Sequence, residues 1–437
     1  MSYFIINGGK KLHGSIKVNS SKNSSVAILC ATPMIKGKTT LANVPVIEEV
    51  KRIIEILISI GLKITWMGKH KLKIINNGKI TIKNLNHKSF VKTRSGLLLL
   101  GSLCAIKNNF SLPKAGGCKL GKRTVNPYML AFEHLGIKMK ETDNSYIVTK
   151  KNPTNAEFTM YESGDTATEN TIMASSLIKG KTIIHFASSN YMVRDLCYFL
   201  KQAGAKITGL NSFKITVEGV KKLKPLKNYP IMPDPIEAMT LISIAITTKS
   251  NLKVIGCPID FLRLELEKLR IMGQKLNISN IYKSDNGFFD LVDIEIIPSK
   301  LTALPDKIYG SPYPGLNMDN LPLFLPILTQ TNGQTLVHDW TYENRAIYYN
   351  ELNNFGADIK LLDPHRVIVS GPTKLKPAEI ICPPALRPAI NLLTCMLSAK
   401  GKSILRNAYP INRGYENIIN RLNRLNDIGA DILEVKE

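Results

Sequence analysis

Ile60-Gly61-Leu62-Lys63-Ile64 is the first copy of a short pattern in which a glycine stands between an apolar residue and the start of a new apolar segment. The pattern returns at intervals of about 70 residues, and its glycines are Gly61, Gly136, Gly204, Gly273, Gly356 and Gly429. The segment 47–60 before the first copy has apolar residues at helical spacing. Because glycine adopts the left-handed conformation at little cost, each copy predicts a helix that ends at the glycine and continues into a strand.

A second pattern marks the beginning of other strands. Lysine or asparagine followed by glycine precedes an apolar run at 36–44, 179–187, 332–340 and 400–408. Such a dipeptide is typical of a turn into a strand. The two patterns together predict six repeats of one α/β unit. Three repeats before about residue 230 and three after it indicate two similar α/β domains, and the three prolines within 229–235 indicate a linker between them. Clefts between two such domains often bind small molecules.

Composition places the chain among soluble globular proteins. It has 437 residues, of which 44% are hydrophobic and 21% are charged, which suits two or three domains. The sequence shows neither the pattern of a secretory signal nor an apolar stretch of the roughly 20 residues that cross a bilayer. We therefore expect a cytoplasmic protein without membrane insertion.

Cysteines and histidines give no metal-binding pattern. The seven cysteines are an odd number without a C-x-x-C pair, and the seven histidines are scattered. We expect reduced thiols, no metal site and no cofactor.

The formal net charge of +24 is the extreme value of the composition. It is compatible with nucleic acid, an anionic membrane surface or acidic small substrates as partners, and equally with lysines spread over a solvated surface. Aromatic residues are 7% of the chain and do not alternate with the basic clusters, as they do in stacking platforms for single strands. We therefore do not expect nucleic-acid binding.

Cys118 stands apart from the other cysteines by its surroundings. It lies in the glycine-rich segment 113–123 together with Lys114, Lys119, Lys122 and Arg123. Nearby cations stabilise a thiolate, so Cys118 is a candidate proton donor or nucleophile rather than a small buried apolar residue. The glycines suggest a lid that moves.

Lys22 and Asn23 follow a pair of serines and precede an apolar run. Ser20 or Ser21 is a good helix N-cap, which places Lys22 and Asn23 in the first helical turn. A lysine there opposes the helix dipole unless an anion lies between it and the free amides. The position is therefore a candidate anion site.

Further candidate groups are three arginines and one carboxylate. Arg94 begins an apolar helix, while Arg345 and Arg413 lie in the segments 342–345 and 411–416. A single arginine is more often a surface group. Asp319, in the turn-rich segment 312–322 before an apolar helix, is either a helix N-cap or a general base.

Several of these motifs, in this order, resemble those of the UDP-N-acetylglucosamine 1-carboxyvinyltransferases of the enolpyruvyl transferase family. The motifs are Lys22-Asn23, the Gly-Gly-Cys118 loop ending at Arg123, Asp319 in its Pro-Tyr-Pro-Gly loop, Glu343-Asn-Arg345, Leu386-Arg387 and Arg413-Gly-Tyr-Glu416. The resemblance covers essentially the whole chain. It implies an α/β fold of two inside-out α/β barrels, built from six repeated βαβαββ-type units.

The resemblance also implies an activity. The enolpyruvyl group of phosphoenolpyruvate would be transferred to the 3-hydroxyl of UDP-N-acetylglucosamine with release of phosphate, the committed step of peptidoglycan precursor synthesis. The thiol of Cys118 would act as general acid and Asp319 as base, and the epoxide antibiotic fosfomycin would attack Cys118. Strongly anionic substrates would suit a basic site.

Binding roles follow from the same resemblance. The groups implied to bind phosphoenolpyruvate are Lys22, Asn23, Arg94, Arg123, Arg345, Arg387 and Arg413, with Lys22 also catalytic. The groups implied to bind the UDP-sugar are Asn23, Arg94, Arg123, Asp165, Asp319 and Thr341. We expect a monomer. The first barrel would comprise residues 22–232 with the cysteine loop and the nucleotide contacts, and the second residues 1–21 plus 233–437 with Asp319.

Some positions depart from the family pattern. Asn126-Pro127-Tyr128 replaces Asp-Leu-His, and Gly164-Asp165-Thr166 stands where Ser-Val-Thr or Ser-Val-Gly is usual. Ala385 and Asn412 replace carboxylates, and Glu48 occupies a place where lysine is expected.

These changes leave three alternatives open. The acceptor could be another nucleotide or nucleotide sugar, or shikimate 3-phosphate as in the shikimate-pathway enolpyruvyl transferase, although the Gly-Gly-Cys118 loop argues against the latter. A relative without catalytic activity that binds UDP-sugar or nucleic acid is the alternative of another class.

Overall fold

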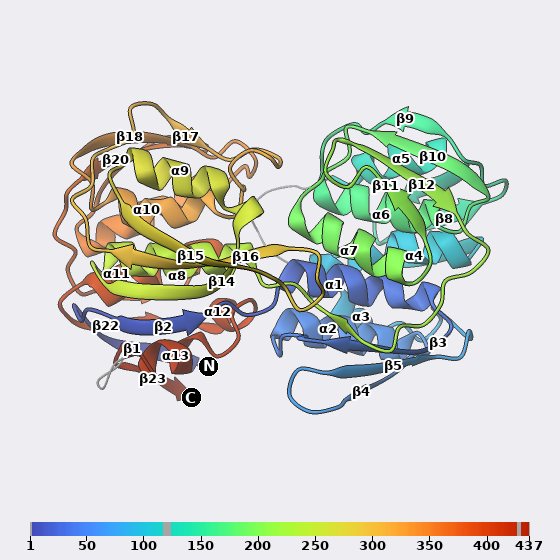
Figure 1. Ribbon diagram of the computed structural model, residues 1–437, viewed down its shortest axis with the longest axis horizontal. Coiled ribbons are helices and arrows are strands. Elements are labelled where there is room, and N and C mark those ends of the chain that lie inside the picture. Colours follow the sequence, from blue (N-terminus) through green and yellow to red (C-terminus); the bar gives the residue numbers. More distant parts are fainter. Residues whose placement is uncertain (1, 117–123, 426–429, 437) are drawn as a thin grey trace. The chain divides into compact units, whose positions relative to one another are not determined.

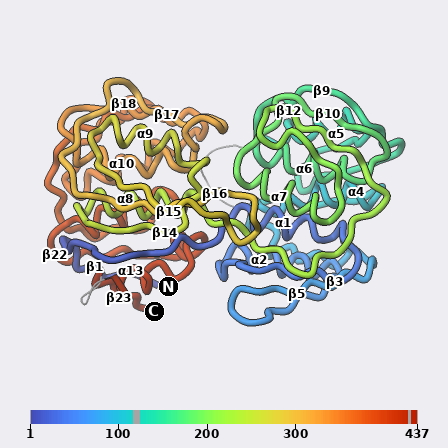
Figure 2. Tube along the Cα trace, in the orientation of Figure 1, coloured from blue at the N-terminus to red at the C-terminus, as the bar shows by residue number. Residues whose placement is uncertain are grey.

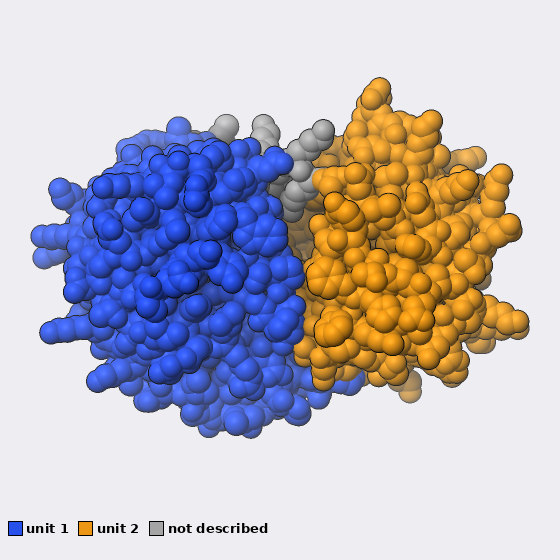
Figure 3. Space-filling model, turned by 90° about the horizontal axis from the view of Figure 1, so that it is seen from above, with its two compact units in different colours: residues 1–19, 119–122, 233–437 blue, residues 20–118, 123–232 orange. Residues whose placement is uncertain are grey.

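The computed structural model describes residues 2–116, 124–425 and 430–436 of the chain. The described residues form two compact units, which Figure 3 colours separately. Unit 2 lies within residues 20–232, and unit 1 contains residues 2–19 and the described part of 233–436. The sequence placed the division after residues 21 and 232, and the roles that it gave to the two domains stay predictions.

Unit 2 contains two of the four-stranded sheets and the three-stranded one, in the orders β13-β3-β5-β4, β11-β12-β10-β9 and β6-β8-β7. Its strands are β3 (Gly37–Ala42), β4 (Lys63–Trp66), β5 (Leu72–Asn76), β6 (Asn109–Pro113), β7 (Ile137–Glu141), β8 (Ser145–Lys150), β9 (Glu157–Thr159), β10 (Gly180–His185), β11 (Lys206–Thr208), β12 (Lys214–Gly219) and β13 (Tyr229–Pro230). Its helices are α1 (Lys22–Ala31), η1 (Thr32–Met34), α2 (Glu48–Ser59), α3 (His87–Phe90), η2 (Arg94–Leu98), α4 (Leu99–Ile106), α5 (Asn126–His134), α6 (Asp165–Ser175) and α7 (Tyr191–Gln202).

Unit 1 contains the sheets β15-β16-β14-β2, β17-β18-β20-β19 and β21-β22-β1-β23. Its strands are β1 (Ser2–Gly8), β2 (His13–Lys17), β14 (Asn251–Pro258), β15 (Lys275–Lys283), β16 (Asp290–Ile297), β17 (Ile308–Tyr309), β18 (Gly333–His338), β19 (Asp358–Asp363), β20 (Arg366–Gly371), β21 (Glu379–Ile381), β22 (Gly401–Arg406) and β23 (Ile432–Lys436). Its helices are α8 (Pro235–Thr247), η3 (Ile259–Phe261), α9 (Arg263–Ile271), η4 (Leu321–Leu323), α10 (Phe324–Leu328), η5 (Ala346–Phe355), α11 (Leu386–Ser398), α12 (Tyr409–Asn412) and α13 (Ile418–Asn423).

Each unit has helices at its centre and sheets outside them. In unit 1, α8 packs on β14, α10 on β20 and α11 on β1, so each central helix covers the inner face of a different sheet (Figure 1). All residues of α8 and α10 are buried, as are most of α1 and α6 in unit 2. The apolar residues on every side of α8 and α10 require such an interior position. The predicted inside-out architecture is confirmed.

The repeat glycines adopt the predicted conformation. The φ angles of Gly61, Gly136, Gly204, Gly273 and Gly356 are 113°, 69°, 102°, 88° and 79°. These angles lie in the left-handed region, in which a residue with Cβ is strained. Gly429 lies outside the described residues.

Two strands are exchanged between repeats. Strand β2, which precedes α1 in sequence, pairs in parallel with β14 of unit 1, while β13, which precedes α8, pairs in parallel with β3 of unit 2. The chain trace in Figure 2 shows the blue N-terminal strands within the unit that otherwise holds the C-terminal half. One sheet of unit 1 likewise combines the two ends of the chain, because the N-terminal strand β1 lies between β22 and β23.

A buried carboxylate of unit 2 gives the first testable prediction. Asp195 on α7 is fully buried and accepts hydrogen bonds from the Tyr229 hydroxyl at 2.6 Å and the Met232 amide at 3.3 Å. Burial raises the pKa of Asp195 to about 7. A raised folded-state pKa means that its stabilising contribution is present below pH 4 and is lost as pH rises to about 7. We expect the stability of wild type relative to Asp195→Asn to fall by about 4 kcal/mol between these limits.

Urea denaturation of both proteins from pH 4 to 8 measures this difference. A constant difference across that range would show that Asp195 does not titrate between the folded and unfolded states in this way.

Candidate functional site

The N-terminus of α1 presents the first two candidate residues, in unit 2. The side chain of Ser21 caps the helix by accepting a hydrogen bond from the Ser24 amide at 3.1 Å, so Lys22 and Asn23 occupy the first turn, as predicted. Both side chains are half-buried. The amide of Asn23 donates to the hydroxyl of Tyr191 on α7 at 2.8 Å. The first turn therefore carries a cation beside helix amides, an arrangement suited to an anion.

Arg94 begins η2 and is also half-buried. The preceding Thr93 caps this helix by accepting from the Ser95 amide at 3.1 Å. Glu49 on α2 accepts hydrogen bonds from the hydroxyls of both Thr93 and Ser95, the latter at 2.8 Å. Arg94 itself donates to the Thr124 carbonyl at 3.4 Å. A buried carboxylate thus fixes the backbone on either side of this arginine.

The Asp165 carboxylate forms hydrogen bonds within unit 2. Asp165 is the first residue of α6 and accepts hydrogen bonds from the Ser188 hydroxyl at 2.5 Å and the Asn190 amide at 3.0 Å. Asn190 is in turn the N-cap of α7. In this arrangement Asp165 ties the beginnings of two helices together. Its assigned contact with the UDP-sugar stays a prediction.

Unit 1 contains the clearest cluster of charged groups, around Asp319. The Nη1 atom of Arg345 lies 3.6 Å from one carboxylate oxygen, and Nη2 of Arg387 lies 3.3 Å from the other. The Asp319 side chain remains 28% exposed, whereas both arginines are buried. Two guanidinium groups stabilise its negative charge, and the exposed part leaves it accessible to a ligand.

The loop that carries Asp319 is held by hydrogen bonds on both sides of this residue. Glu265 on α9 is buried and accepts from the Asn317 amide at 3.2 Å and from the Asn320 side chain at 2.8 Å. The side chain of Asn317 accepts from the Asp319 backbone amide at 2.9 Å. The structure therefore supports a fixed carboxylate rather than a helix cap, since Asn320, not Asp319, is the N-cap of the following helix η4.

Arg345 is fully buried and makes several contacts within the protein. Its Nε and Nη2 donate to both oxygens of Asp339 at 2.5 and 2.8 Å, and Nη2 also donates to the Met318 carbonyl at 2.7 Å. The guanidinium stacks on the Tyr342 ring at 4.2 Å. Among the described residues Nη1 has no hydrogen-bond partner, and it is the atom that faces Asp319. A bidentate pair of this kind fixes the orientation of the arginine.

Arg387 enters the cluster from the beginning of α11. Its Nη1 donates to the Tyr415 hydroxyl at 2.7 Å, and Tyr415 also bonds to the Thr240 hydroxyl at 2.8 Å. Arg413 lies two residues before Tyr415, directly after α12, and is half-buried. Thr341 is half-buried and donates to the Met318 sulfur at 3.0 Å. The structure thus brings Arg345 and Arg387 to Asp319.

Cys118 and Arg123 lie outside the described residues. The six cysteines within them are buried, and burial raises the pKa of each thiol, to about 12 for Cys104 and Cys382. For Cys30, Cys197, Cys257 and Cys395 burial raises the pKa further. Such thiols are unreactive.

The departures from the family pattern take defined places in the structure. Asn126-Pro127-Tyr128 forms the first turn of α5, and Gly164 is the N-cap of α6. Glu48 pairs with Lys51 and Arg52 on α2 at 3.0 and 3.2 Å. Ala385 is the N-cap of α11 and makes no side-chain capping bond, and Asn412 donates to Glu434 at 3.2 Å.

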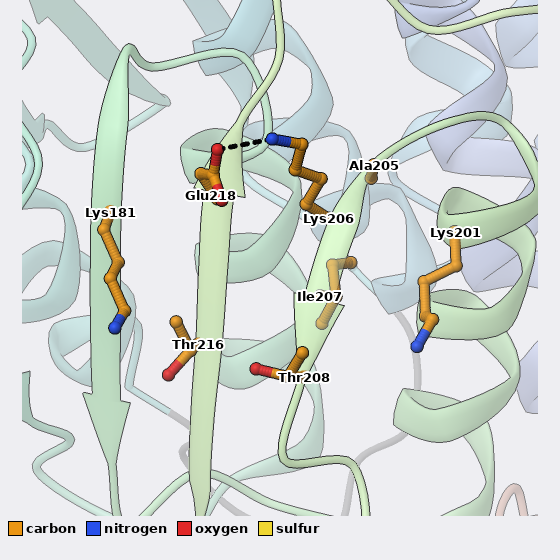
Figure 4. Close-up of a pocket in the computed structure, with 8 residues that line it drawn as sticks. All are labelled: Lys181, Lys201, Ala205, Lys206, Ile207, Thr208, Thr216 and Glu218. Atoms are coloured by element: carbon orange, nitrogen blue, oxygen red, sulfur yellow. Dashed lines mark hydrogen bonds and ion pairs between the residues drawn. The ribbon is translucent and has the colours of Figure 1, made fainter.

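A separate hollow of about 420 Å³ lies on the outer strands of unit 2 and contains none of the candidate residues (Figure 4). The residues that line it are Lys181, Lys201, Ala205, Lys206, Ile207, Thr208, Thr216 and Glu218. Lys206 pairs with Glu218 directly across β11 and β12 at 2.6 Å. Exposed pairs of this kind are typical of a solvated surface.

Two absences apply to the described part of the chain. Within it, we find no group of three histidine, cysteine or acidic side chains arranged to bind a metal ion. No helix of the same residues is both long and apolar enough to span a membrane.

Sequence reasoning did not find the residues that support the candidate groups. Asp339 and Tyr349 in unit 1, and Glu49 and Tyr191 in unit 2, show no motif of their own. Position offered one signal, because Tyr349 stands only four residues after Arg345 in sequence.

Comparison with known proteins first identifies the family and the fold of the chain. The sequence model of the EPSP synthase (3-phosphoshikimate 1-carboxyvinyltransferase) family matches residues 6–422. The enolpyruvyl transferase NikO from Streptomyces tendae shares the fold with a TM-score of 0.85 at 21% identity, covering 100% of this chain and 99% of NikO. An EPSP synthase from Acinetobacter baumannii aligns with a TM-score of 0.73 at 17% identity, over the full length of both chains.

Curated relatives narrow the class. The UDP-N-acetylglucosamine 1-carboxyvinyltransferase of Treponema denticola is 32% identical over 100% of both chains. That of Bradyrhizobium diazoefficiens is 32% identical over 99% of this chain and 98% of its own. The chain therefore belongs to the EPSP synthase family and, within it, to the UDP-N-acetylglucosamine 1-carboxyvinyltransferases.

Proposed function

We propose that the protein transfers the enolpyruvyl group of phosphoenolpyruvate to the 3-hydroxyl of UDP-N-acetylglucosamine and releases phosphate. The full-length similarity to transferases with this name supports the acceptor. The observation that carries the chemistry is Asp319, a partly exposed carboxylate held between two buried guanidinium groups. This reaction provides a precursor of peptidoglycan.

In the proposed mechanism, the 3-oxygen of the sugar forms a bond to C2 of phosphoenolpyruvate while Asp319 takes the hydroxyl proton. The thiol of Cys118 gives a proton to C3, which becomes a methyl group. The tetrahedral intermediate then loses phosphate as the bond between C2 and the phosphate oxygen breaks. The Cys118 thiolate takes a proton back from the methyl group, which restores the double bond, and the proton on Asp319 leaves with the phosphate or passes to solvent. Each proton transfer requires a side chain within hydrogen-bond reach.

Basic groups would neutralise the phosphate and carboxylate of phosphoenolpyruvate. We assign this role to Lys22, Arg94, Arg123, Arg387 and Arg413, with Lys22 also catalytic, and we assign to Asn23 a hydrogen bond to phosphoenolpyruvate. The complete burial of Arg345 and its bonds to Asp339 support a role in orienting Asp319. A direct contact of Arg345 with phosphoenolpyruvate stays a prediction. Charge-assisted hydrogen bonds of this kind are among the strongest that proteins form.

Binding of the UDP-sugar is assigned to Asn23, Arg94, Arg123, Asp165, Asp319 and Thr341. The Asp165 carboxylate accepts hydrogen bonds from Ser188 and Asn190, which would reduce its repulsion of a diphosphate. Because the segments 126–128 and 164–166 depart from the family pattern, another nucleotide or nucleotide sugar is the alternative to UDP-N-acetylglucosamine as the acceptor.

The acceptor is tested by product analysis. The purified protein is incubated with phosphoenolpyruvate and one of three acceptors, UDP-N-acetylglucosamine, UMP or shikimate 3-phosphate, and products are identified by mass spectrometry. We expect an enolpyruvyl adduct with UDP-N-acetylglucosamine alone. An adduct with either other acceptor, and none with the UDP-sugar, would contradict the proposal.

A further inference from the structure

The Asp339 carboxylate accepts two hydrogen bonds from Arg345 and a third from the hydroxyl of Tyr349. Tyr349 lies on η5, four residues after Arg345, and donates a hydrogen bond to Oδ2 of Asp339. The same oxygen accepts from Nε of Arg345 at 2.5 Å. Arg345 and Tyr349 are fully buried, and Asp339 is 1% exposed. The three side chains therefore form one closed polar group in an apolar interior.

The protonation of Tyr349 is fixed by this environment. Burial raises the pKa of Tyr349 well above its ordinary value, so the hydroxyl remains a donor at physiological pH. Asp339 then receives three donors, two from Arg345 and one from Tyr349. A carboxylate held by donors from two directions has little freedom to rotate, and bonds in such a network reinforce one another.

The position of Asp339 determines where the other end of the guanidinium points. With Nε and Nη2 occupied by Asp339 and the Met318 carbonyl, Nη1 faces Asp319 at 3.6 Å. Asp319 is the proposed base, and this orientation brings the Nη1 group of Arg345 toward it. From these contacts we infer that Tyr349 is a positioning residue of the reaction, which acts through Asp339 and Arg345 on the proposed base Asp319.

This inference rests on the proposed function, and Tyr349→Phe tests it. The substitution keeps the ring and removes one donor. We expect kcat to fall about tenfold, which corresponds to about 1.4 kcal/mol, while KM for both substrates stays within about twofold. The acidic limb of the pH profile of kcat/KM should move to higher pH, because a less firmly placed Arg345 stabilises the Asp319 carboxylate less.

The matched control is Tyr282→Phe in the same unit. The Tyr282 hydroxyl donates to the Asp293 carboxylate at 3.0 Å on the outer strands β15 and β16, and we expect its loss to leave kcat and the pH profile unchanged. If Tyr349→Phe lowers only the melting temperature, with kcat and pH profile as in wild type, Tyr349 is merely structural and the inference is wrong.

A crystal structure of Tyr349→Phe decides the question without an activity assay. We expect Nη1 of Arg345 to lie farther from Asp319 than the 3.6 Å of the unaltered chain. An unchanged separation would overturn the inference. Failure of wild type to use phosphoenolpyruvate and UDP-N-acetylglucosamine would instead count against the proposed function, so the two failures are distinguishable.

Discussion

Asp319→Asn is expected to lower kcat about a thousandfold. General base catalysis contributes roughly 10² to 10⁴ in rate, and an amide cannot take the proton of the sugar hydroxyl. Asparagine keeps the size of the side chain and one oxygen for Arg345 or Arg387. KM should therefore change much less than kcat, which steady-state kinetics of phosphate release will measure.

The control for this prediction is Asp290→Asn in the same unit. Asp290 forms an exposed pair with Lys283 at 2.6 Å on the outer strands, and such pairs contribute about 0–1 kcal/mol to stability. Its kcat should equal that of wild type. If Asp319→Asn retained more than about a tenth of the activity, Asp319 would not be the base.

Cys118→Ser is the second large prediction. A serine hydroxyl is a far weaker acid than a thiol beside cations, so protonation of C3 should slow and kcat should fall at least about a hundredfold. Resistance to fosfomycin should accompany this loss, because the epoxide would have no thiol to attack. Inhibition by fosfomycin and turnover are measured on the same preparations.

The burial of the six cysteines that the structure describes supplies the control. Because their thiol pKa values are raised by burial, brief treatment of the native protein with fosfomycin or iodoacetamide should modify one site, identified by peptide mass spectrometry as Cys118. Modification at a buried cysteine such as Cys382 instead, or full activity of Cys118→Ser, would contradict the assigned role.

Much of the fold could be predicted from the sequence because its repeat has a physical basis. A left-handed residue is a common way to end a helix before a strand, and the five repeat glycines that the structure describes all have positive φ angles. The capping of α1 by Ser21 was predictable for a similar reason, since a side-chain oxygen must satisfy the free amides of the first turn. Local sequence encodes both features.

The exchange of β2 and β13 between repeats has no local signal. Which strand pairs with β14 or with β3 depends on contacts between segments far apart in sequence, since Leu252 pairs with Gly14 and Tyr229 with Leu41. The sequence patterns gave two domains, and the inside-out arrangement followed only from the family resemblance. Long-range pairing is decided by burial of whole faces rather than by any short motif.

The candidate site was predictable in its charged residues and not in their partners. Arg345 and Asp319 drew notice through motifs, whereas Asp339 and Tyr349 are an ordinary acid and an ordinary tyrosine in sequence. Their importance comes from their burial beside Arg345. A buried guanidinium has lost its hydration and therefore needs hydrogen-bond and charge partners within the protein. The sequence therefore predicted that Arg345 binds phosphoenolpyruvate, and it did not predict the bonds of Arg345 to Asp339.

Phosphate release from phosphoenolpyruvate, measured with and without UDP-N-acetylglucosamine, tests the central claim most directly. The account predicts release by wild type only when the UDP-sugar is present, and its near loss in Asp319→Asn and Cys118→Ser. Folded wild-type protein that binds phosphoenolpyruvate but releases no phosphate with this acceptor would contradict the account.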